Sequence, residues 1–193
     1  MKLIVGLGNP GRLYINSRHN IGSAVIKALA KSYKISLKKE KGIPSLSAKV
    51  KICGESAILA MPLTFMNLSG IAVAGLLKKY RIGLADLLVA CDDLDLEFGR
   101  LKLRPSGSSG GQRGLESIIE SIGSQGFSRL RIGIGRPSRD TDASDYVLSP
   151  FTGKEKRQLG QIIEESAECC RSWVSEGVTK TMDIFNRRRS ANE

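Results

Sequence analysis

The chain contains one histidine, His19, in the segment "SRHN". A histidine that has one ring nitrogen held by a carboxylate can use the other nitrogen to take a proton from water. Asp92, which directly follows the apolar run "LLVAC", is the candidate for that carboxylate. A lone histidine is more often structural, so the pair is a hypothesis that depends on whether the fold brings His19 and Asp92 together.

Two asparagines could supply amide groups beside such a pair. Asn9 follows "LIVGLG", and Asn67 lies in "MPLTFMNLSG". Side-chain amides can bind a peptide backbone or polarise a carbonyl oxygen, although Asn9 beside Pro10 is also typical of a turn. These residue types could therefore bind a peptide or a carbonyl group beside the proposed pair.

The acidic segment "CDDLDLEFG" has a second interpretation, as a magnesium site. Its carboxylates are hard oxygen ligands of the kind that Mg²⁺ prefers, and they come from Asp92, Asp93 and Asp95. Consecutive residues on an extended strand point to opposite faces, so Asp92 and Asp93 would not converge on one ion without a turn. The metal interpretation is the weaker of the two, and we expect no metal.

Three glycines near the N-terminus have the G-x-G-x-x-G spacing of a dinucleotide-binding turn, and they are Gly6, Gly8 and Gly11. In that motif a helix begins among the glycines, and an acidic residue follows about 20 positions later. Here the following segment, "NPGRLYINSRHN", is polar and irregular, and "KSYKIS" further on has no carboxylate. The glycines therefore predict a tight loop, and a dinucleotide-dependent oxidoreductase stays only an alternative.

The charge of the chain favours a polyanionic partner. The 193 residues include 30 Lys and Arg against 19 Asp and Glu, a net charge of +11, and a basic balance of this size could also serve solubility alone. Aromatic residues are few, with five Phe, four Tyr and one Trp, which argues against a platform on which single-stranded bases stack. Phosphate groups of a nucleic-acid backbone are the better match.

Cysteines and hydropathy indicate a soluble cytoplasmic protein. The four cysteines show no C-x-x-C spacing, and with one histidine they are too few for a zinc site, so we expect small buried residues in a reducing compartment. No apolar stretch approaches the roughly 20 residues that cross a bilayer. We expect no membrane association.

The elements that must position these residues alternate along the chain. Strand-like runs occur at 2–8, 56–62, 87–91, 99–105 and 129–135, and helical periods occur at 21–29, 68–76, 115–122 and 159–174. Asn20 is a plausible N-cap of the first helix. This alternation predicts one α/β domain, in which ligands bind at the carboxyl ends of strands.

Several motifs, in order and over nearly the whole chain, resemble those of bacterial peptidyl-tRNA hydrolases. They are "VGLGNPG", "RHNIG", "PLTFMNLSG", "DDLDL", "SSGGQRGL" and "RLRIGIGRP". The resemblance implies a single α/β domain over residues 1–186, with a mixed twisted sheet flanked by helices, followed by a basic tail at 187–193. It also implies a cytoplasmic, monomeric enzyme without metal or cofactor that cleaves the ester between a peptide and tRNA.

By the same resemblance, His19 is the base, Asp92 orients it, and Asn9 and Asn67 hold the peptide and the scissile carbonyl. Met66 would line the cleft, and Tyr14 and Arg113 would contact substrate. Cations near the cleft in sequence are expected to contact tRNA phosphates, and they are Lys102, Arg104 and Arg131. An RNA-binding protein on this fold without hydrolase activity, or a metal-dependent phosphohydrolase, are the remaining alternatives.

One motif departs from the family pattern. Many members read "GGHNGL" where this chain reads "GGQRGL", so Arg113 replaces an asparagine that binds substrate in the family. An arginine at the start of a helix, beside a Gly-rich loop, favours contact with a phosphate of the tRNA acceptor stem. Alternatively, Gln112 takes over the amide role and Arg113 only fills space.

Overall fold

The apolar run after Met1 forms a strand whose side chains enter two different cores. In β1 (Lys2–Gly6), Leu3 and Val5 belong to one buried cluster and Ile4 belongs to the other. Side chains alternate between the faces of a strand, so a strand that is apolar at consecutive positions must be covered on both sides. This places β1 inside the sheet, with layers of helices on each face.

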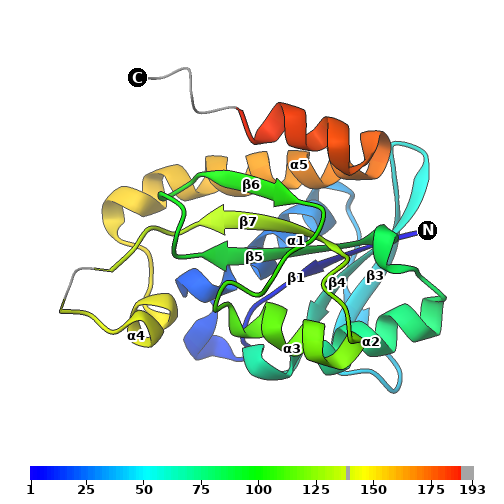
Figure 1. Ribbon diagram of the computed structural model, residues 1–193, viewed down its shortest axis with the longest axis horizontal. Coiled ribbons are helices and arrows are strands. Elements are labelled where there is room, and N and C mark those ends of the chain that lie inside the picture. The colour runs from blue at the N-terminus through cyan, green and yellow to red at the C-terminus, as the bar shows by residue number, and fades with distance from the viewer. Residues whose placement is uncertain (138–139, 188–193) are drawn as a thin grey trace.

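The computed structural model describes residues 1–137 and 140–187 and confirms the mixed sheet (Figure 1). Its seven strands lie in the order β2-β3-β4-β1-β5-β7-β6. Strands β4, β1, β5 and β7 are mutually parallel, while β2, β3 and β6 are antiparallel to their neighbours. The other strands are β2 (Lys38–Lys39), β3 (Ser45–Ile52), β4 (Glu55–Pro62), β5 (Leu87–Asp93), β6 (Leu101–Arg104) and β7 (Ser128–Gly133).

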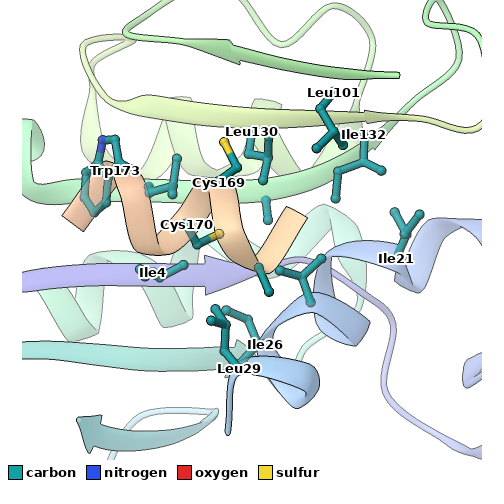
Figure 2. Close-up of a cluster of buried hydrophobic side chains, with 14 of the residues drawn as sticks. Ile4, Ile21, Ile26, Leu29, Leu101, Leu130, Ile132, Cys169, Cys170 and Trp173 are labelled. Atoms are coloured by element: carbon teal, nitrogen blue, oxygen red, sulfur yellow. The ribbon is translucent and has the colours of Figure 1, made fainter. Parts of the chain in front are cut away.

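Two helices cover each face of the sheet. One core joins α1 (Ile21–Ser32) and α5 (Gly153–Phe185) to the sheet, and Figure 2 shows its side chains, with Ile4 of β1 facing Cys170 and Trp173 of α5. The other core joins α2 (Ser69–Tyr80) and α3 (Arg113–Ile122) to the opposite face. Short elements complete the chain: α4 (Ala143–Leu148) and the 3₁₀ turns η1 (Arg12–Tyr14), η2 (Arg18–Asn20), η3 (Met66–Leu68) and η4 (Leu84–Asp86).

Five of the strands and four of the helices were predicted from the sequence. The strands β2 and β3 and the helix α4 were missed. β3 alternates serine and lysine with apolar residues in "SLSAKVKI", a pattern typical of a strand with one exposed face, whereas β2 has only two residues. α4 has six residues and lies at the end of a Gly/Ser/Pro-rich segment, which hides its short period.

Three of the four cysteines are buried as expected, namely Cys91, Cys169 and Cys170. Burial raises the pKa of the Cys170 thiol to about 12, so it is a neutral packing residue. The expectation was wrong for Cys53, which is exposed at the turn between β3 and β4 with φ of 50°.

The end of α5 returns to the last strand of the sheet. The Asn186 side-chain amide donates to the Leu103 carbonyl (3.1 Å), and its oxygen accepts from the Leu103 amide (2.8 Å). These bonds occupy one position on the outer edge of β6. From residue 188 onward, the predicted basic tail lies outside the described residues, and none of the described helices is long and apolar enough to span a membrane.

Candidate active site

The residues proposed for chemistry meet at one edge of the sheet. Strands β4, β1 and β5 are parallel neighbours, so their carboxyl ends lie side by side. Asn67, Asn9 and Asp92 stand at or just beyond these three ends. They line a cavity of about 480 Å³, together with His19, Met66, Gln112 and Arg113 and with residues of α4.

His19 and Asp92 form the predicted pair. His19 Nδ1 lies 2.8 Å from Asp92 Oδ2, and the two residues are 8% and 3% exposed. A carboxylate can only accept a hydrogen bond, so the neutral ring carries its proton on Nδ1 and leaves Nε2 with a lone pair. The ring is thus held in the tautomer that a general base requires.

A close contact between α1 and the sheet brings the two residues together. Gly22 lies in the first turn of α1, and a Cβ there would come within 2.2 Å of the Ala90 carbonyl oxygen on β5. Only a residue without a Cβ lets the helix approach this closely. Because His19 lies three residues before Gly22 and Asp92 two residues after Ala90, the approach sets their separation.

The residue beside His19 is a buried arginine. Arg18, which is 3% exposed, makes two parallel bonds to the Glu155 carboxylate, at 2.7 and 2.8 Å. Its guanidinium also lies over the rings of Tyr146 (4.2 Å) and Phe151 (5.0 Å). The turn that carries His19 is therefore anchored to the start of α5.

Glu155 is ionised in this setting. Burial opposes its charge, but hydrogen bonds from Arg18 and Thr152 outweigh that effect and lower its pKa to about 2. Thr152 and Glu155 also form a capping box at the N-terminus of α5. Nothing in the sequence around "RHN" signals this pair, since an arginine is expected at the surface and its partner is 137 residues away.

Asn20 is the N-cap residue of α1, as predicted, but its side chain makes no capping hydrogen bond. Its side chain instead binds the backbone of Asn9 in both directions, accepting from the Asn9 amide (2.8 Å) and donating to the Asn9 carbonyl (2.9 Å). The Asn9 side-chain oxygen accepts from the Met66 amide at 2.7 Å. Among the described residues the amide nitrogen of Asn9 has no partner, so it can donate to a ligand in the cavity.

The other predicted substrate-binding residues lie at different distances from the cavity. Asn67 is exposed and Met66 is buried, and both line its wall. Tyr14 does not line the cavity itself. Its ring packs edge to face against Phe65, which does, with ring centroids 6.4 Å apart. Phe65 is itself half exposed and lines the cavity, and it was not singled out from the sequence.

A second residue holds the Asp92 carboxylate. The Gln112 amide nitrogen donates to Asp92 Oδ1 at 3.0 Å, while its amide oxygen accepts from the Leu115 backbone at the start of α3 (2.8 Å). Both ends of the Gln112 amide are thus engaged within the protein. This geometry does not favour the alternative in which Gln112 replaces the family asparagine as a ligand of the substrate.

The acidic segment separates into two arrangements. Asp92 turns to His19, whereas Asp93 pairs with Arg131 of β7 and accepts from the Asp95 amide at 2.8 Å. Within residues 1–137 and 140–187, no three His, Cys, Asp or Glu side chains are grouped as metal ligands. The divergence of Asp92 and Asp93 is the one expected for consecutive strand residues, and it gives the magnesium interpretation no support.

The predicted phosphate-binding cations form a strip beside the cavity. Lys102 and Arg104 lie on β6, and Lys102 is paired in register with Arg131. The pKa of Lys102 is lowered by partial burial and then by the positive charges of its neighbours, Arg104 first. These cations lie outside the cavity lining, and the Arg131–Asp93 ion pair joins the strip to the cavity wall.

Arg113 is the first residue of α3 and is exposed on the cavity wall, as predicted. The Gly-rich loop before it is held by Arg129, which is 2% exposed and donates to the Ser108 (3.0 Å) and Gln125 (2.9 Å) carbonyls. Arg129 was not identified from the sequence, because its buried role depends on a loop that lies elsewhere in the chain.

The fold and the site define the class of protein: an α/β enzyme whose cleft, at the carboxyl ends of its central strands, contains a histidine–aspartate pair and several amides. The sequence model of the peptidyl-tRNA hydrolase family matches residues 3–193. The chain belongs to this family.

Individual relatives agree with this assignment. The peptidyl-tRNA hydrolase of Desulforudis audaxviator (strain MP104C) is 47% identical over 194 residues, which cover 100% of this chain and 97% of the relative. That of Aquifex aeolicus (strain VF5) is 44% identical over 188 residues, 97% of each chain. The crystal structure of peptidyl-tRNA hydrolase from Acinetobacter baumannii superposes with a TM-score of 0.91 at 35% identity, covering 97% of this chain and 95% of that one.

Proposed function

We propose that this protein hydrolyses the ester bond between peptide and tRNA in peptidyl-tRNA, with His19 as the general base. The observation that carries the proposal is the 2.8 Å contact between His19 Nδ1 and Asp92 Oδ2 at the cavity wall. Membership of the peptidyl-tRNA hydrolase family supplies the substrate class.

The reaction needs one water molecule and no covalent bond between the enzyme and the substrate. His19 Nε2 takes a proton from water while the water oxygen attacks the ester carbonyl carbon. The bond from that carbon to the ribose oxygen then breaks, and the imidazolium returns its proton to the ribose oxygen. The peptide leaves as a carboxylic acid that releases its remaining proton to the solvent, and free tRNA leaves with it. Asp92 stabilises the transient positive charge on His19.

The amides of the cavity would hold the peptide. The Asn9 amide nitrogen is available to donate to a carbonyl oxygen, and Asn67 offers a second, exposed amide. Met66 and Phe65 give the wall an apolar part, with Tyr14 supporting Phe65 from behind. A free aminoacyl-tRNA presents a charged amine where this site would accept an amide, so the enzyme should spare it.

The cationic strip would hold the tRNA. Lys102 and Arg104 carry its charge along β6, and Arg131 links it to the cavity. Arg113 adds a cation on the cavity wall at a helix N-terminus, where the helix dipole also attracts anions. The net charge of +11 suits this role. We further propose that the protein acts as a cytoplasmic monomer without a metal or cofactor.

The test is hydrolysis of N-acetyl-aminoacyl-tRNA by the purified protein in EDTA, followed as release of free tRNA. The wild type should hydrolyse this substrate and spare free aminoacyl-tRNA. His19→Ala should lower turnover by at least roughly 100-fold with tRNA affinity preserved, because only the base is lost. Near-normal turnover in His19→Ala would refute the assignment. Binding of tRNA without hydrolysis by the wild type would favour the RNA-binding alternative, and activity that EDTA abolishes would favour a metal-dependent enzyme.

A further inference from the structure

The Asp92 carboxylate has two hydrogen-bond partners, and only one of them is the histidine. Oδ2 faces His19 Nδ1 at 2.8 Å, and Oδ1 accepts from Gln112 Nε2 at 3.0 Å. Asp92 is 3% exposed, so these bonds largely replace the water that would otherwise solvate its charge. The hydrogen bonds to His19 and Gln112 together set the orientation of the carboxylate plane. They therefore also set the direction in which Oδ2 faces His19.

Gln112 is itself fixed from three directions. Its amide oxygen accepts from the Leu115 amide at 2.8 Å, which makes Gln112 the N-cap of α3, and its amide nitrogen also lies 3.4 Å from Met66 Sδ. The two ends of the amide cannot be exchanged, because a backbone N–H requires the oxygen and a carboxylate requires the nitrogen. The amide nitrogen therefore points at Asp92 for as long as α3 is capped.

We propose that Gln112 is a positioning residue for the hydrolysis, which holds Asp92 in the orientation that supports His19 and does so with a group that does not titrate. The proposal rests on the proposed role of His19 as the base. The Gln112 amide does not gain or lose a proton between acidic and basic pH. Its hydrogen bond to Asp92 is therefore the same across the pH range in which His19 acts.

The other charged groups around the pair are engaged elsewhere or lie at the rim. Asp93 of β5 is paired with Arg131 of β7, and Asp95 is paired with Arg136. On η2, Arg18 is paired with Glu155 of α5, and α3 contributes the exposed Arg113. The part of the cavity wall formed by α4 is uncharged, and consists of Ala143, Ser144, Val147 and Leu148. Gln112 is thus the group from α3 that touches the Asp92 carboxylate directly.

Two substitutions separate positioning from helix capping. Gln112→Glu keeps the shape and an oxygen that can accept from Leu115, and a negative charge at a helix N-terminus is favourable, so α3 stays capped. It removes the donor to Asp92 and places a second carboxylate beside the first. Gln112→Met removes the donor and the cap without adding charge.

For Gln112→Glu we expect kcat at neutral pH to fall by about tenfold or more, with a KM change of less than about threefold. The acid limb of its kcat profile should move to higher pH by about one unit, because the added negative charge favours the protonated form of the nearby imidazole. Gln112→Met should also lower kcat, but the pH at which kcat declines on the acidic side should shift less than in Gln112→Glu.

The matched control is Gln161→Glu. Gln161 also donates its amide to a carboxylate, that of Glu165 at 2.9 Å, but on the exposed face of α5. This variant should keep the wild-type kcat and pH profile.

The proposal is overturned if Gln112→Glu keeps both the wild-type kcat and the wild-type pH profile. It is also overturned if Gln112→Glu and Gln112→Met lose activity equally at all pH values, with no shift of the pH at which kcat declines. His19→Ala, measured in parallel, separates this failure from that of the proposed function. An active His19→Ala protein refutes the base itself, whereas an inactive one combined with an unmoved Gln112→Glu profile refutes the role of Gln112 alone.

Discussion

The ion pair between Arg18 and Glu155 gives the most quantitative prediction, tested by Glu155→Gln. The pKa of Glu155 falls from a usual 4.5 to about 2 in the folded protein. At about 1.4 kcal/mol per pKa unit, this corresponds to roughly 3 kcal/mol of stabilisation, and removing the charge also leaves Arg18 buried without its counter-ion. We therefore expect Glu155→Gln to lower the free energy of unfolding at pH 7 by about 3 kcal/mol. The melting temperature should fall by about 6 to 12 °C for a chain of this length.

The pH dependence provides the stricter test. Because the folded state holds Glu155 at a lower pKa than the unfolded state, the ionised side chain stabilises the fold fully above about pH 5. That stabilisation is lost progressively as the pH falls from about 5 through the folded-state pKa of about 2, and both states are protonated only below that pH. In urea unfolding followed by circular dichroism, the difference between wild type and Glu155→Gln should shrink as the pH is lowered from 7 toward 3.

The control for this experiment is Glu176→Gln on the same helix. Glu176 pairs with Lys180 at 3.3 Å, but about half of its side chain is exposed, so solvent screens the pair and little change is expected. If Glu155→Gln lowers stability by the same amount at pH 7 and at pH 3, or lowers it no more than Glu176→Gln does, the ion pair does not hold the turn before His19 as the geometry indicates.

Three further predictions follow from single residues. Asp92→Asn keeps the shape of the site but removes the charge that supports His19, so turnover should fall less than in His19→Ala and the pH profile should change; an unchanged profile would show that another group orients the ring. Arg113→Ala should weaken binding of peptidyl-tRNA and lower the slope of log affinity against log salt by about 0.7 to 1, as for one lost phosphate contact. Hydrolysis of a short ester on a single nucleotide should not change, and equal damage to both substrates with an unaltered slope would contradict the phosphate contact. Cys53→Asn should raise the free energy of unfolding by about 0.5 to 1 kcal/mol, measured in urea, because Asn followed by Gly54 suits a turn with φ of 50° and 85° better than Cys does; a loss of stability would mean that the turn is not strained.

The sequence was sufficient for the parts of the site that lie next to regular elements. Asn9 and Asp92 follow apolar runs that could only be buried strands, and parallel strands bring their carboxyl ends to one edge. His19 lies two residues before the first residue of α1, so its place near that edge could also be predicted. The opposite directions of Asp92 and Asp93 follow from strand alternation alone.

Other parts of the site depend on contacts that have no local pattern. Arg18 would be expected at the surface, and its burial requires Glu155, far along the chain at the start of α5. Asn20 has the right type and place for an N-cap, but the backbone of Asn9 offers it two hydrogen bonds instead of one. Gln112 could be located before the helix, yet its contact with Asp92 depends on how α3 meets the end of β5.

The contact between Asn186 and Leu103 bears on how the protein avoids aggregation. β6 is a terminal strand, and an uncovered terminal strand can recruit a strand from a second molecule. The asparagine amide occupies the Leu103 N–H and C=O from the side, so it blocks the position at which such a strand would begin to add. At the opposite end of the sheet, β2 is short and carries the exposed charges of Lys38 and Lys39, which repel an incoming strand. A chain shortened before Asn186 would keep the catalytic cleft, but the backbone N–H and C=O of Leu103 would be free to pair with a strand of another molecule.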